Sequence, residues 1–162
     1  WPFFAAPDAR PDGGALRLTC RGARRPSFLA RQVPVDRFTA LATVDVPRRH
    51  GPGIGLAAQG PGRVLRGIEL RDGRVRAFRS DDRGLRLGAT QPAPAGPRLR
   101  LVVNATPDGA VALYVGAVRG APARIAGGPA ETGLPATRAA LTCRGTGSTR
   151  VETLVAHGAP SP

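Results

Sequence analysis

Residues 68–77 read IELRDGRVRA, and this stretch carries the clearest hairpin signal in a chain of 162 residues. Apolar and charged residues alternate on both sides of Asp72-Gly73. An Asp-Gly pair favours a two-residue type I′ turn, because both central residues of that turn have positive φ. Alternation with a period of two places apolar side chains on one face of a strand and charged side chains on the other. The stretch therefore predicts a β-hairpin whose arginines and Glu69 face away from the core.

Strand-like runs recur along the whole chain. They lie at 15–20, 28–35, 38–46, 55–59, 64–70, 74–79, 85–87, 98–105, 110–118, 137–144 and 149–156. Turn residues separate the runs, with Gly- and Pro-rich loops at 89–97 and 120–135, and no window has a convincing helical period of 3.6 residues. Evenly spaced short strands predict an all-β sandwich or barrel. We expect a single β-sandwich domain at 15–157, after an irregular N-terminal arm at 1–14 and before a C-terminal tail at 158–162.

The two cysteines occupy identical pentapeptides near opposite ends of the chain. LTCRG occurs at 18–22 and again at 141–145, so Cys20 and Cys143 have the same neighbours. We predict a disulfide between them, with two free buried thiols as the alternative. A disulfide needs Cα atoms about 5.5–6 Å apart. The pairing therefore predicts that the first and last strands are neighbours.

The order of several segments resembles that of concanavalin A-like β-sandwich domains. The matching segments are FTALATVDV at 38–46, GIGLA at 53–57, the hairpin at 68–79, LRLVV at 99–103 and DGAVALYV at 108–115. In layout they are most similar to laminin-G-like domains and to the C-terminal sandwiches of family 43 glycoside hydrolases. Residues 149–156 of this chain match the final strand of these domains loosely. The resemblance implies a two-sheet antiparallel jelly roll with adjacent first and last strands. It also implies a module that binds carbohydrate or supports a catalytic domain.

The charge of the chain is strongly positive. All 24 basic residues are Arg, against 11 acidic residues, which gives a formal net charge of +13. Such a chain attracts polyanions, and we expect an acidic polysaccharide or another cell-surface polymer as the partner, without specific nucleic-acid recognition. GC-rich coding also produces an excess of Arg, so codon usage is the alternative explanation. The absence of Lys excludes Schiff-base chemistry and a P-loop lysine.

Composition also bears on cofactors and location. Two His and two Cys are too few for a closed zinc site, and we expect no cofactor and no metal; nothing supports a structural calcium ion. No apolar run is long enough to span a membrane. Because the chain contains no Met, residue 1 follows either a processing event or an excised boundary, and we expect that a signal peptide was removed. The expected location is therefore secreted or at the cell surface.

The candidate ligand-binding residues are exposed arginines and one tyrosine. They are Arg71, Arg74 and Arg76 of the hairpin, Arg98 and Arg100 of the strand 98–105, and Tyr114. If these strands share one sheet, their arginines form a basic stripe suited to carboxylate, sulfate or phosphate. The alternative is an ordinary solvated face on which Glu69 pairs with one Arg. Tyr114 combines a strand position with a polar tip and could stack on a sugar.

Catalytic residues are not predicted, because no pair of carboxylates has the spacing that glycoside hydrolysis requires. The hypothesis that the protein is a glycosidase remains only if distant carboxylates such as Asp45 and Glu152 converge in space. Asp81-Asp82 is interpreted as a turn or solvated charge, with a calcium role as the alternative. We expect His50 and His157 to be solvent-exposed.

The first residues allow two interpretations. Trp1, Phe3 and Phe4 could fold back over the sandwich, or they could dock on a neighbouring copy as a donated strand. The strand order, the predicted disulfide and the basic stripe favour a non-catalytic secreted module that binds an anionic glycan or supports a larger extracellular protein. A docked arm favours the alternative, a homo-oligomeric structural subunit of a surface assembly that is joined through this arm.

Overall fold

The alternating runs of the sequence form antiparallel strands in a computed structural model, which describes residues 7–33, 37–125 and 135–158 except for the side chains of Ala23, Thr153 and Leu154. The strands are β1 (Asp8–Asp12), β2 (Ala15–Gln32), β3 (Phe38–Asp45), β4 (Gly53–Gln59), β5 (Leu65–Arg71), β6 (Arg74–Asp81), β7 (Gly84–Leu87), β8 (Gln91–Pro92), β9 (Arg98–Ala105), β10 (Val111–Ala117), β11 (Ala123–Arg124) and β12 (Arg138–Gly158). A 3₁₀ turn, η1 (Pro61–Arg63), precedes β5.

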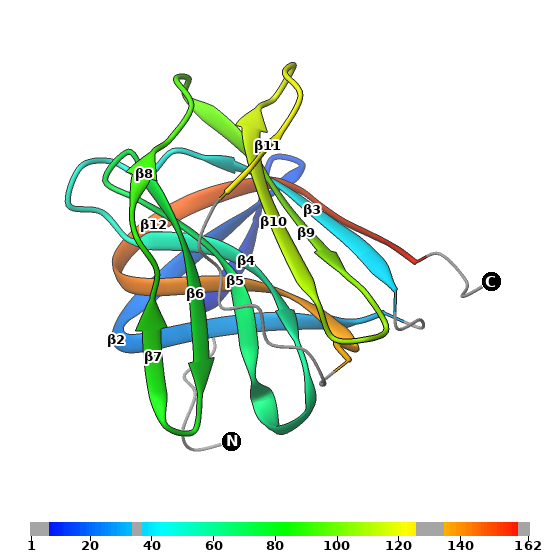
Figure 1. Ribbon diagram of the computed structural model, residues 1–162. Helices are drawn as coiled ribbons and strands as arrows, with labels where there is room; N and C mark the ends of the chain where they lie inside the picture. The colour runs from blue at the N-terminus through cyan, green and yellow to red at the C-terminus, as the bar shows by residue number, and fades with distance from the viewer. Residues whose placement is uncertain (1–6, 34–36, 126–134, 159–162) are drawn as a thin grey trace.

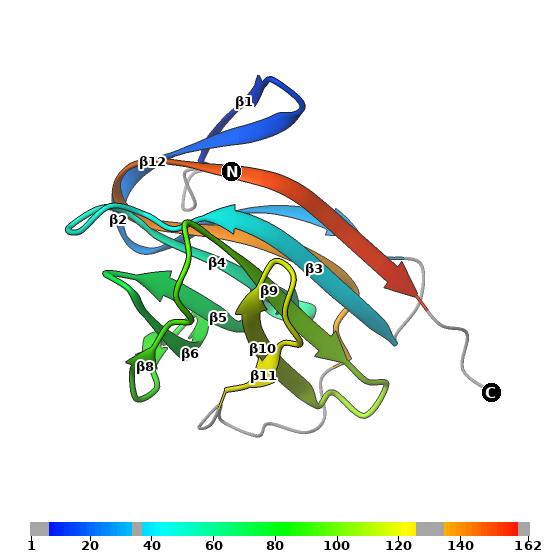
Figure 2. The same ribbon diagram turned by 90° about the horizontal axis from the view of Figure 1, so that it is seen from above.

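The strands form two facing layers (Figures 1 and 2). Hydrogen bonding follows the order β11-β10-β9-β3-β12-β4-β5-β6-β7, with β2 beside β12, β1 beside β2, and β8 beside β6. β12 passes from one layer into the other, because its first part pairs with β4 and its last part with β3. The predicted fold class is confirmed: the protein is an antiparallel all-β sandwich, and the strand that begins at Ala15 is adjacent to the last strand.

Two glycines allow β2 and β12 to bend where they change layers. Gly22 and Gly145 end the two LTCRG segments and have φ of 78° and 81°, a region that residues with a Cβ rarely adopt. The β2–β12 register shifts on both sides of Gly145. The sequence predicts separate strands here, and this is wrong, because the glycines bend both strands without ending them.

The predicted disulfide is confirmed at this bend. Cys20 and Cys143 are bonded, with their Cα atoms 5.5 Å apart. Both cysteines are buried, at 4% and 1% exposure. The bond therefore joins β2 and β12 at the corner where each strand leaves one layer for the other.

The prediction of an irregular arm through residue 14 is wrong for Asp8–Asp12. These residues form β1, which pairs with β2 through a turn at Gly13-Gly14. Pro11 is accommodated because β1 is an edge strand, where a missing N–H leaves no ladder bond unmade. Trp1, Phe3 and Phe4 lie outside the described residues, and so does the tail after Gly158.

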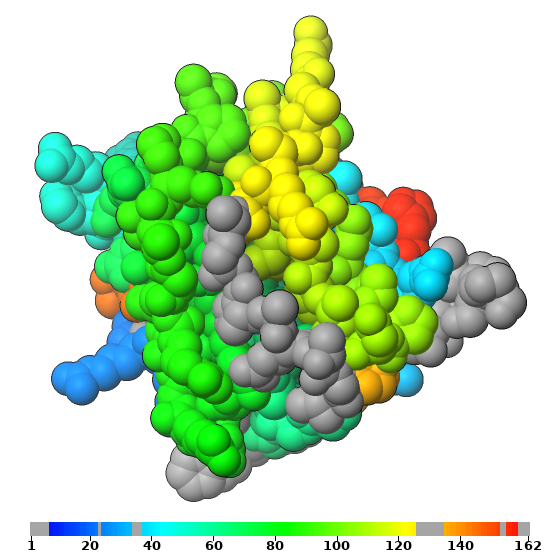
Figure 3. All heavy atoms as spheres, viewed as in Figure 1, coloured from blue at the N-terminus to red at the C-terminus, as the bar shows by residue number. Residues whose placement is uncertain are grey.

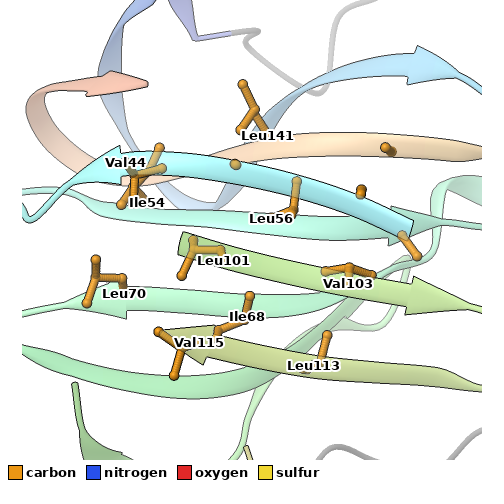
Figure 4. Close-up of a cluster of buried hydrophobic side chains, with 14 of the residues drawn as sticks. Val44, Ile54, Leu56, Ile68, Leu70, Leu101, Val103, Leu113, Val115 and Leu141 are labelled. Atoms are coloured by element: carbon orange, nitrogen blue, oxygen red, sulfur yellow. The ribbon is translucent and has the colours of Figure 1, made fainter. Parts of the chain in front are cut away.

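The core fills the space between the layers. Figure 4 shows Val44, Ile54, Leu56, Ile68, Leu70, Leu101, Val103, Leu113, Val115 and Leu141 pointing into it, and each is at most 6% exposed. Ile68 and Leu70 belong to this cluster, as the alternation at 68–77 predicts. A smaller cluster consists of Ala57 of β4, Leu65 of β5, Phe78 of β6 and Ala140 of β12.

Asp81 is a buried ion-pair partner, so its interpretation as a turn or solvated residue is wrong. Its Oδ2 accepts hydrogen bonds from Arg79 at 2.8 Å and from Arg86 at 3.2 Å, and its Oδ1 accepts one from the Arg83 backbone at 3.0 Å. The hydrogen bond from Arg79 is the main reason that the pKa of Asp81 falls to about 2. Asp82, by contrast, is exposed.

We expect Asp81→Asn to lower the free energy of unfolding by about 1–3 kcal/mol at neutral pH. The pKa of about 2 in the folded state lies below the ordinary 3.8, so the carboxylate stabilises the fold above about pH 4 and loses this effect as the pH falls toward 2. Urea unfolding of both proteins at neutral and acidic pH checks this. The difference between them should shrink in acid; a constant difference would contradict the assignment.

Candidate functional site

A groove lies at the end of the sandwich where β3 finishes and β4 and β9 begin. This end of the strands is uppermost in Figure 1. It consists of two hollows of about 560 and 480 Å³ that share Asp45, Val46 and Arg150. We call it the loop-end groove. Its other lining residues are Arg17, Pro47, Arg48, Gly51, Pro52, Pro97, Arg98, Gly147, Ser148, Thr149 and Glu152. The β3–β4 loop, which carries Arg48, projects from the molecule (teal, upper left in Figure 3).

A row of arginines runs toward this groove across neighbouring strands. Arg17 of β2 lies opposite Arg10 of β1 on one side and opposite Arg150 of β12 on the other. Like charges in direct cross-strand contact destabilise a sheet, so this row needs carboxylates. Asp12 accepts a hydrogen bond from Arg17 at 2.8 Å. The cationic row is therefore offset in part by ion pairs.

Glu152 fixes two groove arginines. Its Oε2 lies 2.5 Å from Arg98 Nη1, and its Oε1 lies 3.2 Å from Arg150 Nη1. Asp45 lines the same hollow, so the two carboxylates named as a glycosidase alternative do converge. Both Glu152 oxygens are engaged, however, and among the described residues Asp45 forms no ion pair. The arrangement therefore offers guanidinium donors and one carboxylate acceptor.

A third, smaller hollow of about 130 Å³ lies on the outer face of the β5–β6 hairpin. We call it the hairpin recess; its lining residues are Arg71, Asp72, Arg74, Arg76 and Thr90. The turn beneath it has φ of 51° at Asp72 and 69° at Gly73, which confirms the predicted positive φ at both residues. The recess shares no lining residue with the loop-end groove.

Glu69 anchors the arginines beside this recess. Its Oε1 accepts hydrogen bonds from Arg76 at 3.1 and 2.8 Å and from Arg144 at 2.8 Å, and its Oε2 accepts one from Arg144 at 2.7 Å. Burial alone would raise the pKa of Glu69, but hydrogen bonds from Arg144 and Arg76 outweigh it and lower the pKa. Hydrogen bonding to Glu69 in turn raises the pKa of Arg144. Gly53 leaves room for the carboxylate, since a Cβ there would lie 2.7 Å from Oε2.

The structure separates the predicted ligand-binding residues into different places. Arg71, Arg74 and Arg76 line the hairpin recess, whereas Arg98 lines the loop-end groove in the other layer. They do not form one stripe, because β5 and β6 belong to one layer and β9 to the other.

Two further candidates line neither the loop-end groove nor the hairpin recess. Arg100 is half-buried rather than exposed, and its Nη2 donates to the Val118 carbonyl at 2.6 Å. Tyr114 of β10 pairs with Val102 of β9 and with Arg124 of β11. His50 and His157 are exposed, as predicted.

Sequence reasoning missed several groove and recess residues. Arg17, Arg48 and Arg150 were not singled out, although the alternation of 15–20 and 149–156 was a usable signal for two of them. Arg144 stands in the second LTCRG segment, and the repeat could have drawn attention to it. Among the described residues, no group of three His, Cys, Asp or Glu side chains could hold a metal ion. That part of the chain also contains no helix long and apolar enough to cross a membrane.

Comparison with known proteins defines the fold. No protein-family model and no curated protein sequence matches the chain. Among solved structures, a bifunctional GH43-CE protein from Bacteroides eggerthii aligns with a TM-score of 0.69 and 12% identity, over 90% of this chain and 22% of that one. The carbohydrate binding module CBM66 from Bacillus subtilis aligns with a TM-score of 0.65 and 10% identity, over 94% and 92%. A legume lectin-like domain from Entamoeba histolytica aligns with a TM-score of 0.57 and 11% identity, over 95% of this chain and 88% of that one.

These similarities show that the protein has the fold of the concanavalin A-like β-sandwiches, as the order of sequence segments predicts. The chain spans 22% of the first matching structure and 33% of a GH43B protein from Bacteroides ovatus. It corresponds in size to the binding module and to the lectin-like domain, which it covers almost completely.

Proposed function

We propose that this protein is a non-catalytic module that binds an acidic polysaccharide or another anionic cell-surface polymer, in a secreted or surface location. The loop-end groove carries the proposal. Its larger hollow, about 560 Å³, falls within the range of roughly 300–1,000 Å³ of pockets for organic ligands. The likeness in fold to a carbohydrate binding module and to a lectin-like domain supports a glycan as the occupant.

The groove offers the polar groups that sugar hydroxyls need. Asp45 is a carboxylate acceptor without an ion-pair partner in the described part of the chain, and Thr149 Oγ1 donates to the Asp45 carbonyl at 3.1 Å. Arg98 and Arg150 present planar guanidinium donors that Glu152 holds in place. A hydroxyl group can donate to the carboxylate and accept from a guanidinium at once.

The balance of charge favours an anionic ligand. Arg17, Arg48, Arg98 and Arg150 line the groove, against the two carboxylates of Asp45 and Glu152. The formal charge of the whole chain, +13, adds long-range attraction that salt screens. An acidic sugar would therefore gain from both the local and the overall charge.

A glycan array probed at low and at physiological ionic strength tests this function. We expect binding to uronic-acid or sulfated glycans that weakens as salt is raised, with weaker binding to neutral glycans of the same backbone. The oxidised, full chain is the right probe, because Cys20 of the disulfide lies opposite Gly147, which lines the groove. The absence of salt-sensitive binding to any acidic glycan would overturn the proposal.

A further inference from the structure

The hairpin recess concentrates positive charge that the fold leaves uncompensated. Arg71 of β5 lies directly opposite Arg74 of β6, a cross-strand pair of like charges that destabilises a hairpin. Arg76 is the next outward residue on β6. The neighbouring carboxylate of Asp72 is turned to the β3–β4 loop, where its Oδ1 accepts a hydrogen bond from the His50 backbone at 2.6 Å. Its Oδ2 lies 3.9 Å from Arg71 Nε.

Glu69 does not neutralise the recess either. It pairs with Arg76, but it pairs equally with Arg144 from β12, so one carboxylate serves two guanidinium groups. Counting Arg71, Arg74, Arg76 and Arg144 against Glu69 and Asp72, four cations face two anions. The recess therefore keeps an excess of positive charge after all its ion pairs are made.

The guanidinium groups are also held in place before any ligand arrives. Arg76 donates two hydrogen bonds to Glu69, and Arg74 Nε donates to Thr90 Oγ1 at 3.1 Å. Arg71 lies against Gly145, where a Cβ would be 3.6 Å from its Nη2. The Arg71 and Arg76 side chains are nevertheless 34% and 21% exposed. Folding has thus already reduced the entropy cost of ordering them, and an anion can still reach them.

We propose that the hairpin recess binds a tetrahedral oxyanion, either free sulfate or phosphate or the same group as an ester. At about 130 Å³ the recess is far smaller than an organic-ligand pocket but has room for one such group. Several oxygens of a tetrahedral anion can accept from Arg71, Arg74 and Arg76 together, as guanidinium groups favour. The proposal does not depend on the groove, because the two places share no lining residue.

Sulfate titration followed by amide NMR at constant ionic strength tests this site. We expect saturable shifts at residues 71–76 and at Thr90, and an affinity at least about fivefold weaker in Arg71→Gln and Arg74→Gln. Arg124→Gln removes the same charge from β11 in the other layer and should change the affinity less than about twofold. Non-saturating shifts, or equal effects of all three substitutions, would overturn the proposal.

The source of the oxyanion is distinguished by a second titration. Glucose 6-sulfate and glucose are compared under the same conditions. Shifts at the recess with the sulfated sugar alone identify esters as ligands, whereas binding of inorganic sulfate alone identifies the free ion. Shifts with unsulfated glucose equal to those with its sulfate would contradict oxyanion recognition. A glycan array without hits leaves this result intact, so the failure of one proposal is separable from that of the other.

Discussion

Glu69→Gln is expected to lower the free energy of unfolding by about 3–5 kcal/mol. The Glu69 side chain is only 5% exposed, and those of its partners Arg76 and Arg144 are 21% and 14% exposed. Removing the carboxylate charge leaves two largely buried guanidinium groups without their shared counterion, and burial of an unpaired charge is costly. Equilibrium unfolding in urea or guanidinium chloride measures the change.

Glu152→Gln is the matched control for this substitution. It removes the same charge from a carboxylate that also bridges two arginines, but Glu152 is 26% exposed and its partner Arg98 is 46% exposed. Solvent screens such pairs, so the expected loss is about 1 kcal/mol or less. If both substitutions lower the free energy of unfolding by the same amount, burial does not determine how much the Glu69 ion pairs contribute to stability.

Loss of the disulfide is expected to lower the free energy of unfolding by about 2–5 kcal/mol. Cys20 and Cys143 are separated by 123 residues in sequence, so the bond restricts a very large loop in the unfolded chain. Reductant acts on this bond alone, because the chain contains two cysteines, both in the bond. Unfolding curves of the chain with and without reductant give the difference.

The double substitution Cys20→Ser and Cys143→Ser controls for effects of the reductant. It should unfold at the same denaturant concentration as the reduced wild type, since both lack the covalent link. Identical unfolding midpoints for oxidised and reduced protein would contradict a stabilising bond at the β2–β12 bend.

Local patterns predicted most of the strands, but they missed β1 and divided β2 and β12 into separate strands. The stretch at 68–77 sets the hairpin turn, the core positions of Ile68 and Leu70 and the outward position of Glu69. The run at 98–105 matches β9 at both ends. Alternation and turn chemistry act between near neighbours in the chain, so the sequence contains this information directly.

The arrangement of the candidate site was less accessible from sequence. Alternation places Arg76 and Arg98 on outward faces but does not reveal that β6 and β9 lie in different layers. That separation depends on β12, which connects the layers by bending at Gly145. The second partner of Glu69, Arg144, is 75 residues away in sequence. Contacts of this kind become visible only when the layers are assembled.

Mapping a bound glycan from the array with amide NMR tests whether the loop-end groove binds an anionic glycan. If the groove is the binding site, the largest shifts fall at Asp45, Arg48 and 147–150, and the affinity falls about tenfold in Arg150→Gln but less than twofold in Arg124→Gln. Shifts centred on Tyr114 and the outer face of β10, with equal losses in the two variants, would contradict it.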